Sequence, residues 1–286
     1  MRLSVIAFIV LVLIISPAVI AQKAASPVSG ATGLFILNTG STLGAGSWSV
    51  DIDAINRDRV QNFAAFGGGE STLDYTQAAA TVAYGITDRW EAELSVPYFR
   101  THVNNVISPN PFFDLNSPDV HAWDDSYLST RFLLSGTPGG PADASKLALR
   151  LFVALPTGDS NLTPSREAGA GIEWSSGPWV VNALYADNGR YPASVKNPDY
   201  FLAGVGYHRM VGQRMDWMTE IDAQQWVHAD FHITDSVDLI TGPRIWLDDR
   251  KTIAVNLGVT TELRQFGDRH PFGYVFGITL ASPRRP

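Results

Sequence analysis

Three short triplets of Asp and His have the clearest capacity for chemistry in this sequence. They are Asp51-Ile52-Asp53, Asp119-Val120-His121 and Asp230-Phe231-His232. An Asp pair that faces an Asp–His pair can activate a water molecule for hydrolysis, because one group accepts the proton while the others orient the attack. Asp51 and Asp53 fall early in an expected strand rather than at its end, and such triplets are frequent by chance. We therefore interpret them as polar groups without a catalytic role.

Other reactive arrangements are equally sparse. The chain has no Cys, which removes thiol nucleophiles, disulfides and thiolate metal sites. None of its six His has a Ser two residues away, as a lipase-type base and nucleophile would need. His228 and His232 could share one face of a strand as metal ligands, but we expect them in a solvated loop. The sequence therefore predicts no enzyme, no metal site and no cofactor.

The composition points away from an ordinary soluble domain. Of 286 residues, 45% are hydrophobic and only 17% are charged, against about 25% charged in typical soluble domains. The formal net charge is −7 and the isoelectric point is near 5.3. This balance argues against a nucleic-acid partner, which usually requires a basic surface.

The first 21 residues resemble a targeting segment rather than part of the fold. Met1-Arg2 is a short positive start, Leu3 to Ile15 is almost uninterruptedly apolar, and Val19-Ile20-Ala21 fits a cleavage site for small residues. We predict a signal peptide at 1–21 that is cleaved before Gln22. A membrane-anchoring helix is the alternative, although the stretch is shorter than the roughly 20 residues needed to span a bilayer.

Beyond this segment the sequence repeats with a period of two, which is typical of strands. Trp48 to Ala54, Trp90 to Val96 and Trp217 to Ala223 all alternate apolar and polar residues. The pattern predicts twelve strands, at 47–58, 72–84, 90–102, 124–134, 146–156, 168–175, 179–187, 200–210, 216–226, 236–247, 251–265 and 272–280. So high a strand content is typical of a closed barrel.

The gaps between the expected strands alternate between longer and shorter ones. The short ones look like turns, for example Ser176-Gly177-Pro178 and Asp248-Asp249-Arg250. Outer-membrane barrels have this asymmetry, with short periplasmic turns and long outer loops. We therefore predict an all-β fold, a closed antiparallel transmembrane β-barrel of about twelve strands, with both termini in the periplasm.

The parity of the strand residues separates an outer from an inner face. Tryptophans that fall on the apolar parity near the periplasmic strand ends predict a membrane-interface belt, made of Trp48, Trp90, Trp174, Trp179 and Trp217. Charged residues on the opposite parity are predicted to line the lumen, which spares them the cost of facing lipid. They are Asp51, Asp53, Glu91, Glu93, Arg131, Arg150, Glu220, Asp222, Asp238, Arg244, Glu262 and Arg264.

The segment 22–45 precedes the first expected strand and contains the apolar run Gly33-Leu34-Phe35-Ile36-Leu37. It is periplasmic, or it folds into the lumen as a plug. We hypothesise that it gates the barrel, so that deletion of 22–45 raises the conductance. The barrel is expected at 46–280 and a tail at 281–286.

Several short motifs resemble known barrels. Thr32-Gly33-Leu34-Phe35 with Ser41 to Val50 is similar to the opening strand of outer-membrane barrels of the MetA-pathway (phenol degradation) family, and equally to stand-alone OmpA-type barrel domains. Tyr84 to Glu91 with Val96-Pro97-Tyr98, and Leu155-Pro156-Thr157-Gly158-Asp159, resemble the family's turn, third strand and strand-to-loop motif. The resemblance implies a porin-like outer-membrane channel for small apolar or aromatic solutes, and it brings no catalytic residues.

Two departures from that pattern stand out. Such barrels commonly end on an aromatic residue, whereas Ala281 to Pro286 follow the alternating run 272–280, and no peptidoglycan-binding domain follows the barrel. We expect a passive channel or transporter in the bacterial outer membrane, with membrane lipid, the barrel-insertion machinery and a small solute as partners. A structural or adhesive barrel that binds partners through loops 59–71, 103–123 and 188–199 is the alternative, and an omptin-like rim protease the remote one.

Overall fold

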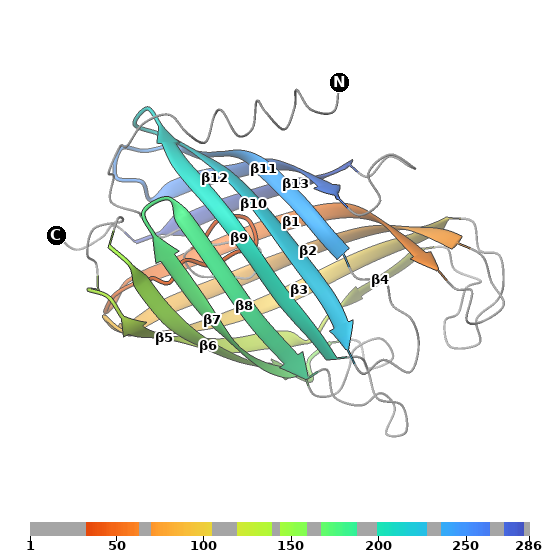
Figure 1. Ribbon diagram of the computed structural model, residues 1–286, viewed down its shortest axis with the longest axis horizontal. Helices are drawn as coiled ribbons and strands as arrows, with labels where there is room; N and C mark the ends of the chain where they lie inside the picture. Colours follow the sequence, from red (N-terminus) through yellow and green to blue (C-terminus); the bar gives the residue numbers. More distant parts are fainter. Residues whose placement is uncertain are drawn as a thin grey trace.

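The computed structural model describes residues 33–62, 70–104, 119–138, 144–158, 167–187, 199–227, 236–263 and 272–282. These residues form strands joined by turns (Figure 1). The strands are β1 (Trp48–Asn62), β2 (Glu70–Thr87), β3 (Trp90–Asn104), β4 (Asp119–Trp123), β5 (Ser126–Ser135), β6 (Lys146–Leu155), β7 (Ala168–Ser176), β8 (Trp179–Asp187), β9 (Asp199–Val211), β10 (Met215–Val227), β11 (Ser236–Trp246), β12 (Ile253–Glu262) and β13 (Phe272–Ala281). No helix in the described ranges is long and apolar enough to cross a membrane.

The strands close into a barrel, because every pairing is antiparallel and the first strand also pairs with the last. β1 pairs with β2 along its whole length, and it pairs with β13 from Ser49↔Ala281 to Asn56↔Tyr274. The other strands pair with their neighbours in sequence, except that β3 pairs with both β4 and β5. The β1–β13 pairing closes the sheet, which a sheet inside a bilayer requires. The predicted closed antiparallel barrel is confirmed.

Thirteen strand segments make a wall of twelve strands, because β4 and β5 are two parts of one interrupted strand. β3 pairs with β4 at Tyr98↔Trp123 and with β5 at Ser95↔Tyr127. Val96 and Pro97 therefore face three residues, which is a β-bulge. Pro97 has no N–H to donate, and its carbonyl accepts the N–H of Asp124 at 3.0 Å instead.

The two faces of the wall have opposite polarity. Along β13 the exposed residues are Phe272, Tyr274, Phe276, Ile278 and Leu280, and the residues between them are buried. Acidic side chains point the other way, and Asp51 is 0% exposed. A soluble protein would bury its apolar face and expose its charged one. The arrangement is that of a transmembrane barrel, with lipid against the apolar face.

The connections differ at the two ends of the barrel. At the end where β1 begins and β13 ends, β2 and β3 are joined by residues 88–89, β7 and β8 by 177–178, and β9 and β10 by 212–214. Gly177 and Gly212 have φ of 55° and 74°, a conformation that glycine adopts readily. The opposite end carries the longer connections, such as 105–118 and 188–198. We call these the turn end and the loop end; the predicted alternation of gap lengths is present.

The β11–β12 turn is built around one carboxylate. Asp248 accepts the backbone N–H groups of Thr252 at 2.7 Å and Ile253 at 2.9 Å, and the hydroxyl of Thr252 at 2.9 Å. Desolvation opposes the charge of Asp248, but these hydrogen bonds outweigh it and lower the pKa of the carboxyl below its ordinary value. The turn is therefore most stable with Asp248 ionised.

Candidate functional site in the lumen

Residues 33–45, which we call the plug, lie inside the barrel at its turn end. The plug makes a narrow loop, closed by a bridge between Gly33 and Asn38 and by the N–H of Leu34, which donates to the carbonyl of Leu37 at 2.8 Å. Leu34, Phe35 and Leu37 are buried, and Leu37 is 0% exposed. In Figure 1 the plug is the red-orange loop between the walls. Chain that precedes the first strand therefore fills this part of the lumen.

Apolar plug side chains sit on glycines of the wall. A Cβ atom at Gly204 would lie 2.6 Å from Leu37 Cδ2, one at Gly206 would lie 2.6 Å from Leu34 Cδ2, and one at Gly258 would lie 3.0 Å from Phe35 Cζ. These missing side chains leave recesses that the plug occupies. The buried apolar core of the molecule forms around them. Its wall members are Ile55, Val180, Met218, Ile240 and Val275.

Polar side chains of the wall hold the plug by its main chain on one side of the lumen. Arg244 on β11 donates Nη1 to the carbonyl of Gly33 at 2.9 Å and Nη2 to that of Leu34 at 3.0 Å. Glu220 on β10 accepts the N–H groups of Ile36 and Leu37 at 2.7 and 3.1 Å. Each charged group thus satisfies two successive peptide groups, and charged partners make the stronger hydrogen bonds.

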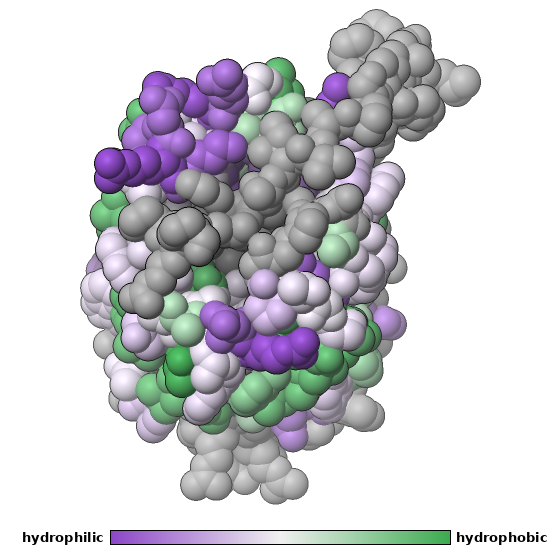
Figure 2. All heavy atoms as spheres, turned by 90° about the vertical axis from the view of Figure 1, so that its left-hand side faces the viewer, coloured by the Kyte–Doolittle hydropathy of each residue, from purple (hydrophilic) through white to green (hydrophobic). Residues whose placement is uncertain are grey.

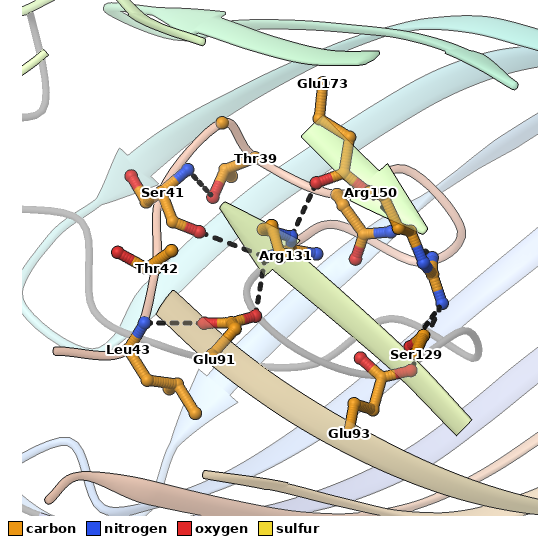
Figure 3. A network of polar contacts seen from close by, with 12 residues as sticks. Thr39, Ser41, Thr42, Leu43, Glu91, Glu93, Ser129, Arg131, Arg150 and Glu173 are labelled. Atoms are coloured by element: carbon orange, nitrogen blue, oxygen red, sulfur yellow. Dashed lines mark hydrogen bonds and ion pairs between the residues drawn. The ribbon is translucent and has the colours of Figure 1, made fainter. Parts of the chain in front are cut away.

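An ion-pair cluster on the other side of the lumen holds the far part of the plug (Figure 3). Arg131 on β5 contacts Glu91 on β3 at 3.0 Å and Glu173 on β7 at 2.6 Å, and it donates to the carbonyl of Ser41 at 3.0 Å. Glu91 also accepts the N–H of Leu43 at 2.6 Å. Arg131 is 2% exposed. A charge this deeply buried needs partners on every side, and the plug supplies one of them.

The same cluster extends toward the loop end. Arg150 on β6 contacts Glu93 at 3.2 Å and lies 4.0 Å from Glu173. The space among Glu91, Glu93, Arg131 and Arg150 leaves no room for a water molecule. Ion pairs therefore connect the strands here, and the space between these side chains is closed to water.

The structure places the residues predicted to line the lumen as follows. Asp51, Asp53, Glu91, Glu93, Arg131, Glu220, Asp222, Asp238, Arg244 and Glu262 are buried, and Arg150 has a side chain that is 12% exposed. They form three groups, of which the first surrounds Arg131 and the second surrounds Arg244, with the charges of Asp51, Asp53 and Glu220 acting on Arg244. Asp222, Asp238 and Glu262 face one another across β10, β11 and β12. Arg264 lies outside the described residues.

Three residues that hold the plug or its cluster were not among those predicted. Glu173 joins the two arginines, Asn182 bonds both the N–H and the carbonyl of Asn38 at 2.7 Å, and Ser175 accepts the N–H of Gly40 at 3.3 Å. Alternation along 172–175 and 180–183 gives these three residues the inward parity. That signal was present in the sequence, but β7 and β8 are short and rich in small residues.

The loop-end half of the lumen is lined differently. The registers run Phe152↔Gly169, Gly169↔Ala186, Ala186↔Tyr200 and Tyr200↔Trp226, so these positions form one row across β6 to β10. Phe152, Tyr200 and Trp226 are half-buried rather than buried. Glu167 accepts the hydroxyls of Tyr127 and Tyr200, the first at 2.7 Å. An aromatic row therefore crosses this half on β6 to β10, and a carboxylate beside it, Glu167, is bonded to phenols. Buried carboxylates, Asp238 on β11 and Glu262 on β12, also lie on inward positions of this half.

The outer face carries aromatic residues at both ends. Trp48, Trp90, Trp179 and Trp217 are 38–44% exposed at the turn end, and Trp174 is half-buried there. Trp90 and Trp217 donate their indole N–H to Thr130 and Thr241. Figure 2, a view onto the turn end, shows hydrophilic residues gathered at the rim and hydrophobic ones around the flank. Exposed indoles at this level suit a membrane interface.

Within the described residues, the two carboxylates of the Asp51-Ile52-Asp53 triplet and His121 lie on opposite faces of the wall. Asp51 and Asp53 are buried in the lumen, whereas His121 on β4 is exposed beside the buried Ala122, on the outward parity. Asp230 and His232 lie outside the described residues, as does His228. Within the described ranges no group of three or more His, Asp or Glu side chains could hold a metal ion.

No family model matches the sequence, and no curated protein matches it. Among solved structures, it is similar to an outer-membrane channel from Pseudomonas putida F1, with a TM-score of 0.59, 12% identity, and coverage of 85% of this chain and 97% of that chain. Its fold is that of the outer-membrane barrels. At this identity the likeness concerns the fold alone.

Two further structures show weaker likeness. The translocator domain of the autotransporter NalP from Neisseria meningitidis has a TM-score of 0.46 at 9% identity, covering 85% of this chain and 89% of that chain. The toluene transporter TodX from Pseudomonas putida has a TM-score of 0.41 at 10% identity, covering 93% and 96%.

Proposed function

We propose that this protein is a passive channel or transporter of the bacterial outer membrane for small apolar solutes, and that the plug closes it. The observation that carries the proposal is the division of one lumen into two parts. The turn-end part holds the plug, and the loop-end part carries a row of half-buried aromatic side chains on β6 to β10. The Pseudomonas barrel of the same fold is described as an outer-membrane channel, which supports the proposal.

Apolar and aromatic solutes suit the loop-end lining. Ligand sites are lined mainly by hydrophobic and aromatic side chains with few polar groups. Phe152, Tyr200 and Trp226 offer such surface in one row, and Glu167 is already satisfied by two phenols. A solute that enters from the loop end meets this row before it reaches the plug.

Opening requires the plug to leave the lumen or to shift within it. The hydrogen bonds to be broken include those to the wall residues Arg244, Glu220, Asn182, Ser175, Arg131 and Glu91. We further propose a signal peptide at 1–21 and the periplasm on the turn-end side. Membrane lipid and the barrel-insertion machinery are the proposed partners. The proposal assigns no catalytic or cofactor-binding role.

The test compares the full-length wild type with Leu34→Asp/Leu37→Asp, which puts charges into apolar recesses and expels the plug. In planar bilayers the variant should conduct more than the wild type, as should a chain lacking 22–45; an unchanged conductance counts against gating. Because apolar molecules cross phospholipid unaided, solute uptake is measured in cells with a lipopolysaccharide outer membrane. Faster uptake of a labelled aromatic hydrocarbon than in cells without the protein supports the proposal, and equal rates oppose it.

A structural barrel is the second candidate, since the buried ion-pair cluster and the plug also suit a barrel that never opens. Liposome swelling with graded solutes separates the two. Permeation in any of the variants above supports a channel, whereas a barrel that stays tight after the plug is expelled supports the structural role. The long loops that would bind partners lie mostly outside the described residues.

A further inference from the structure

The wall contacts the plug mainly through the plug's peptide groups. Arg244 bonds two successive carbonyls and Glu220 two successive N–H groups, at 2.7 to 3.1 Å. Asn182 then takes both the N–H and the carbonyl of Asn38, each at 2.7 Å. Every segment of polypeptide, whatever its side chains, offers these donors and acceptors.

The same mode continues along the plug. Ser175 accepts the N–H of Gly40, Arg131 donates to the carbonyl of Ser41, and Glu91 accepts the N–H of Leu43. Six wall side chains from β3, β5, β7, β8, β10 and β11 thus reach main-chain groups between Gly33 and Leu43. The plug side chain of Thr42 also bonds the wall, donating to the carbonyl of Asp88 at 2.7 Å.

The apolar recesses select side chains of the plug. Leu34, Phe35 and Leu37 fit against Gly206, Gly258 and Gly204, where a Cβ atom would lie 3.0 Å or less from them. The spacing is Leu-Phe-x-Leu. A ligand with apolar side chains at these three positions and free peptide groups between and after them meets all the contacts described.

We propose that the turn-end lumen is a binding site for short peptide segments of the form Leu-Phe-x-Leu, recognised through their main chain, and that the plug is its resident ligand. All six wall groups belong to the barrel, so the site is complete without a covalent link to the peptide. A peptide supplied from another chain competes with the plug and takes its place. The proposal holds whichever solute the barrel passes.

The experiment uses the full-length Leu34→Asp/Leu37→Asp variant, purified in detergent, and a fluorescent synthetic peptide of residues 33–45. Fluorescence anisotropy should show saturable 1:1 binding, and at least tenfold weaker binding to the wild type, whose own plug occupies the site. Native folding is checked by heat-modifiable mobility in gels. The full-length Ile36→Pro variant, which removes one N–H donor to Glu220, provides a second plug-displaced barrel with an intact wall.

Two controls separate main-chain recognition from adsorption of an apolar peptide to the micelle. A peptide N-methylated at Ile36 and Leu37 keeps every side chain but loses both donors to Glu220, and it should bind at least tenfold more weakly. Glu220→Ala in the plug-displaced chain should weaken binding similarly, whereas Thr219→Ala, on the outward face of the same strand, should not. Absent binding to both folded variants, or equal binding of the methylated peptide, overturns the proposal. Peptide binding by a barrel that passes no solute would preserve this proposal and refute the proposed function.

Discussion

The turn-end and loop-end halves of the lumen are lined differently, although the strands of one wall form both. In the turn-end half, buried charged side chains contact peptide groups of the plug and opposite charges, as Arg131 contacts Glu91, Glu173 and the carbonyl of Ser41. In the loop-end half, aromatic residues remain half-buried and the carboxylate of Glu167 is bonded to phenols. The comparison indicates that the turn-end half is organised around the plug, whereas the loop-end half leaves a row of aromatic side chains partly exposed.

The largest effect is expected from breaking the buried ion cluster. Arg131→Met leaves Glu91 and Glu173 without their main partner, and removal of one member of a buried pair costs about 3–5 kcal/mol. The barrel should therefore lose its heat-resistant gel mobility at a lower temperature and conduct more. Arg150→Met, at the edge of the cluster, is the control and should do less. Equal effects of both variants would show that the turn-end half is not organised around Arg131.

Filling a wall recess should open the lumen with less damage. Gly206→Val puts a branched side chain where Leu34 sits, and overpacking of this kind costs roughly 1–3 kcal/mol. Since valine suits a strand, the barrel should still form while the plug is displaced. Single-channel conductance should rise. Ala203→Val, on the exposed face of the same strand, should leave it unchanged; a rise there as well would contradict the assignment of the recess.

In the loop-end half the decisive measurement is the uptake of an aromatic solute rather than the ionic conductance. Phe152→Ala removes one ring of the aromatic row, and an aromatic contact is worth about 0.5–1.5 kcal/mol, or roughly two- to tenfold in affinity. Uptake of a labelled aromatic hydrocarbon by cells should fall by that order, while the bilayer conductance stays as in the wild type. A conductance change without an uptake change would reverse the roles that we assign to the two halves.

The smallest effect is expected outside both halves, in the β11–β12 turn. Folding lowers the pKa of Asp248, so its contribution to stability is present above the unfolded-state value and is lost as the pH falls through the lower, folded-state value. Asp248→Asn should slightly lower the unfolding temperature at neutral pH and flatten its decline in acid below about pH 4. An unchanged acid profile would show that the turn's hydrogen bonds do not depend on the charge.

Strand positions could be predicted closely from the sequence, because each strand must alternate wherever it crosses lipid. The predicted strand at 179–187 coincides with β8, and that at 272–280 ends one residue before β13 does. The hairpin of β1 and β2 was predicted too short, with a loop at 59–71, because the strands continue to Asn62 and from Glu70. Residues 57–59 are Arg-Asp-Arg, where the alternation of apolar residues stops although pairing continues.

The interrupted strand and the side-chain contacts in the lumen could not be predicted from the sequence. β4 lies within the predicted loop 103–123, because five residues are too few to reveal a period and the bulge opposite Pro97 shifts the register. Parity indicated that Arg131 and Glu91 face inward. Which inward residues meet depends on how the closed wall staggers its strands, and that property belongs to the whole barrel.

The link between plug and wall is very short. The chain reverses through Gly44 and Gly46, with φ of 84° and 70°, and enters β1 at Trp48. With a link of this length, the plug can leave the barrel only at the turn end, where β1 starts. During assembly, when β1 pairs with β13, the plug must already be inside the barrel or must enter it from the turn end. A plug that is displaced later leaves on the turn-end side of the membrane. A stimulus from the loop-end side therefore has to act through the length of the lumen.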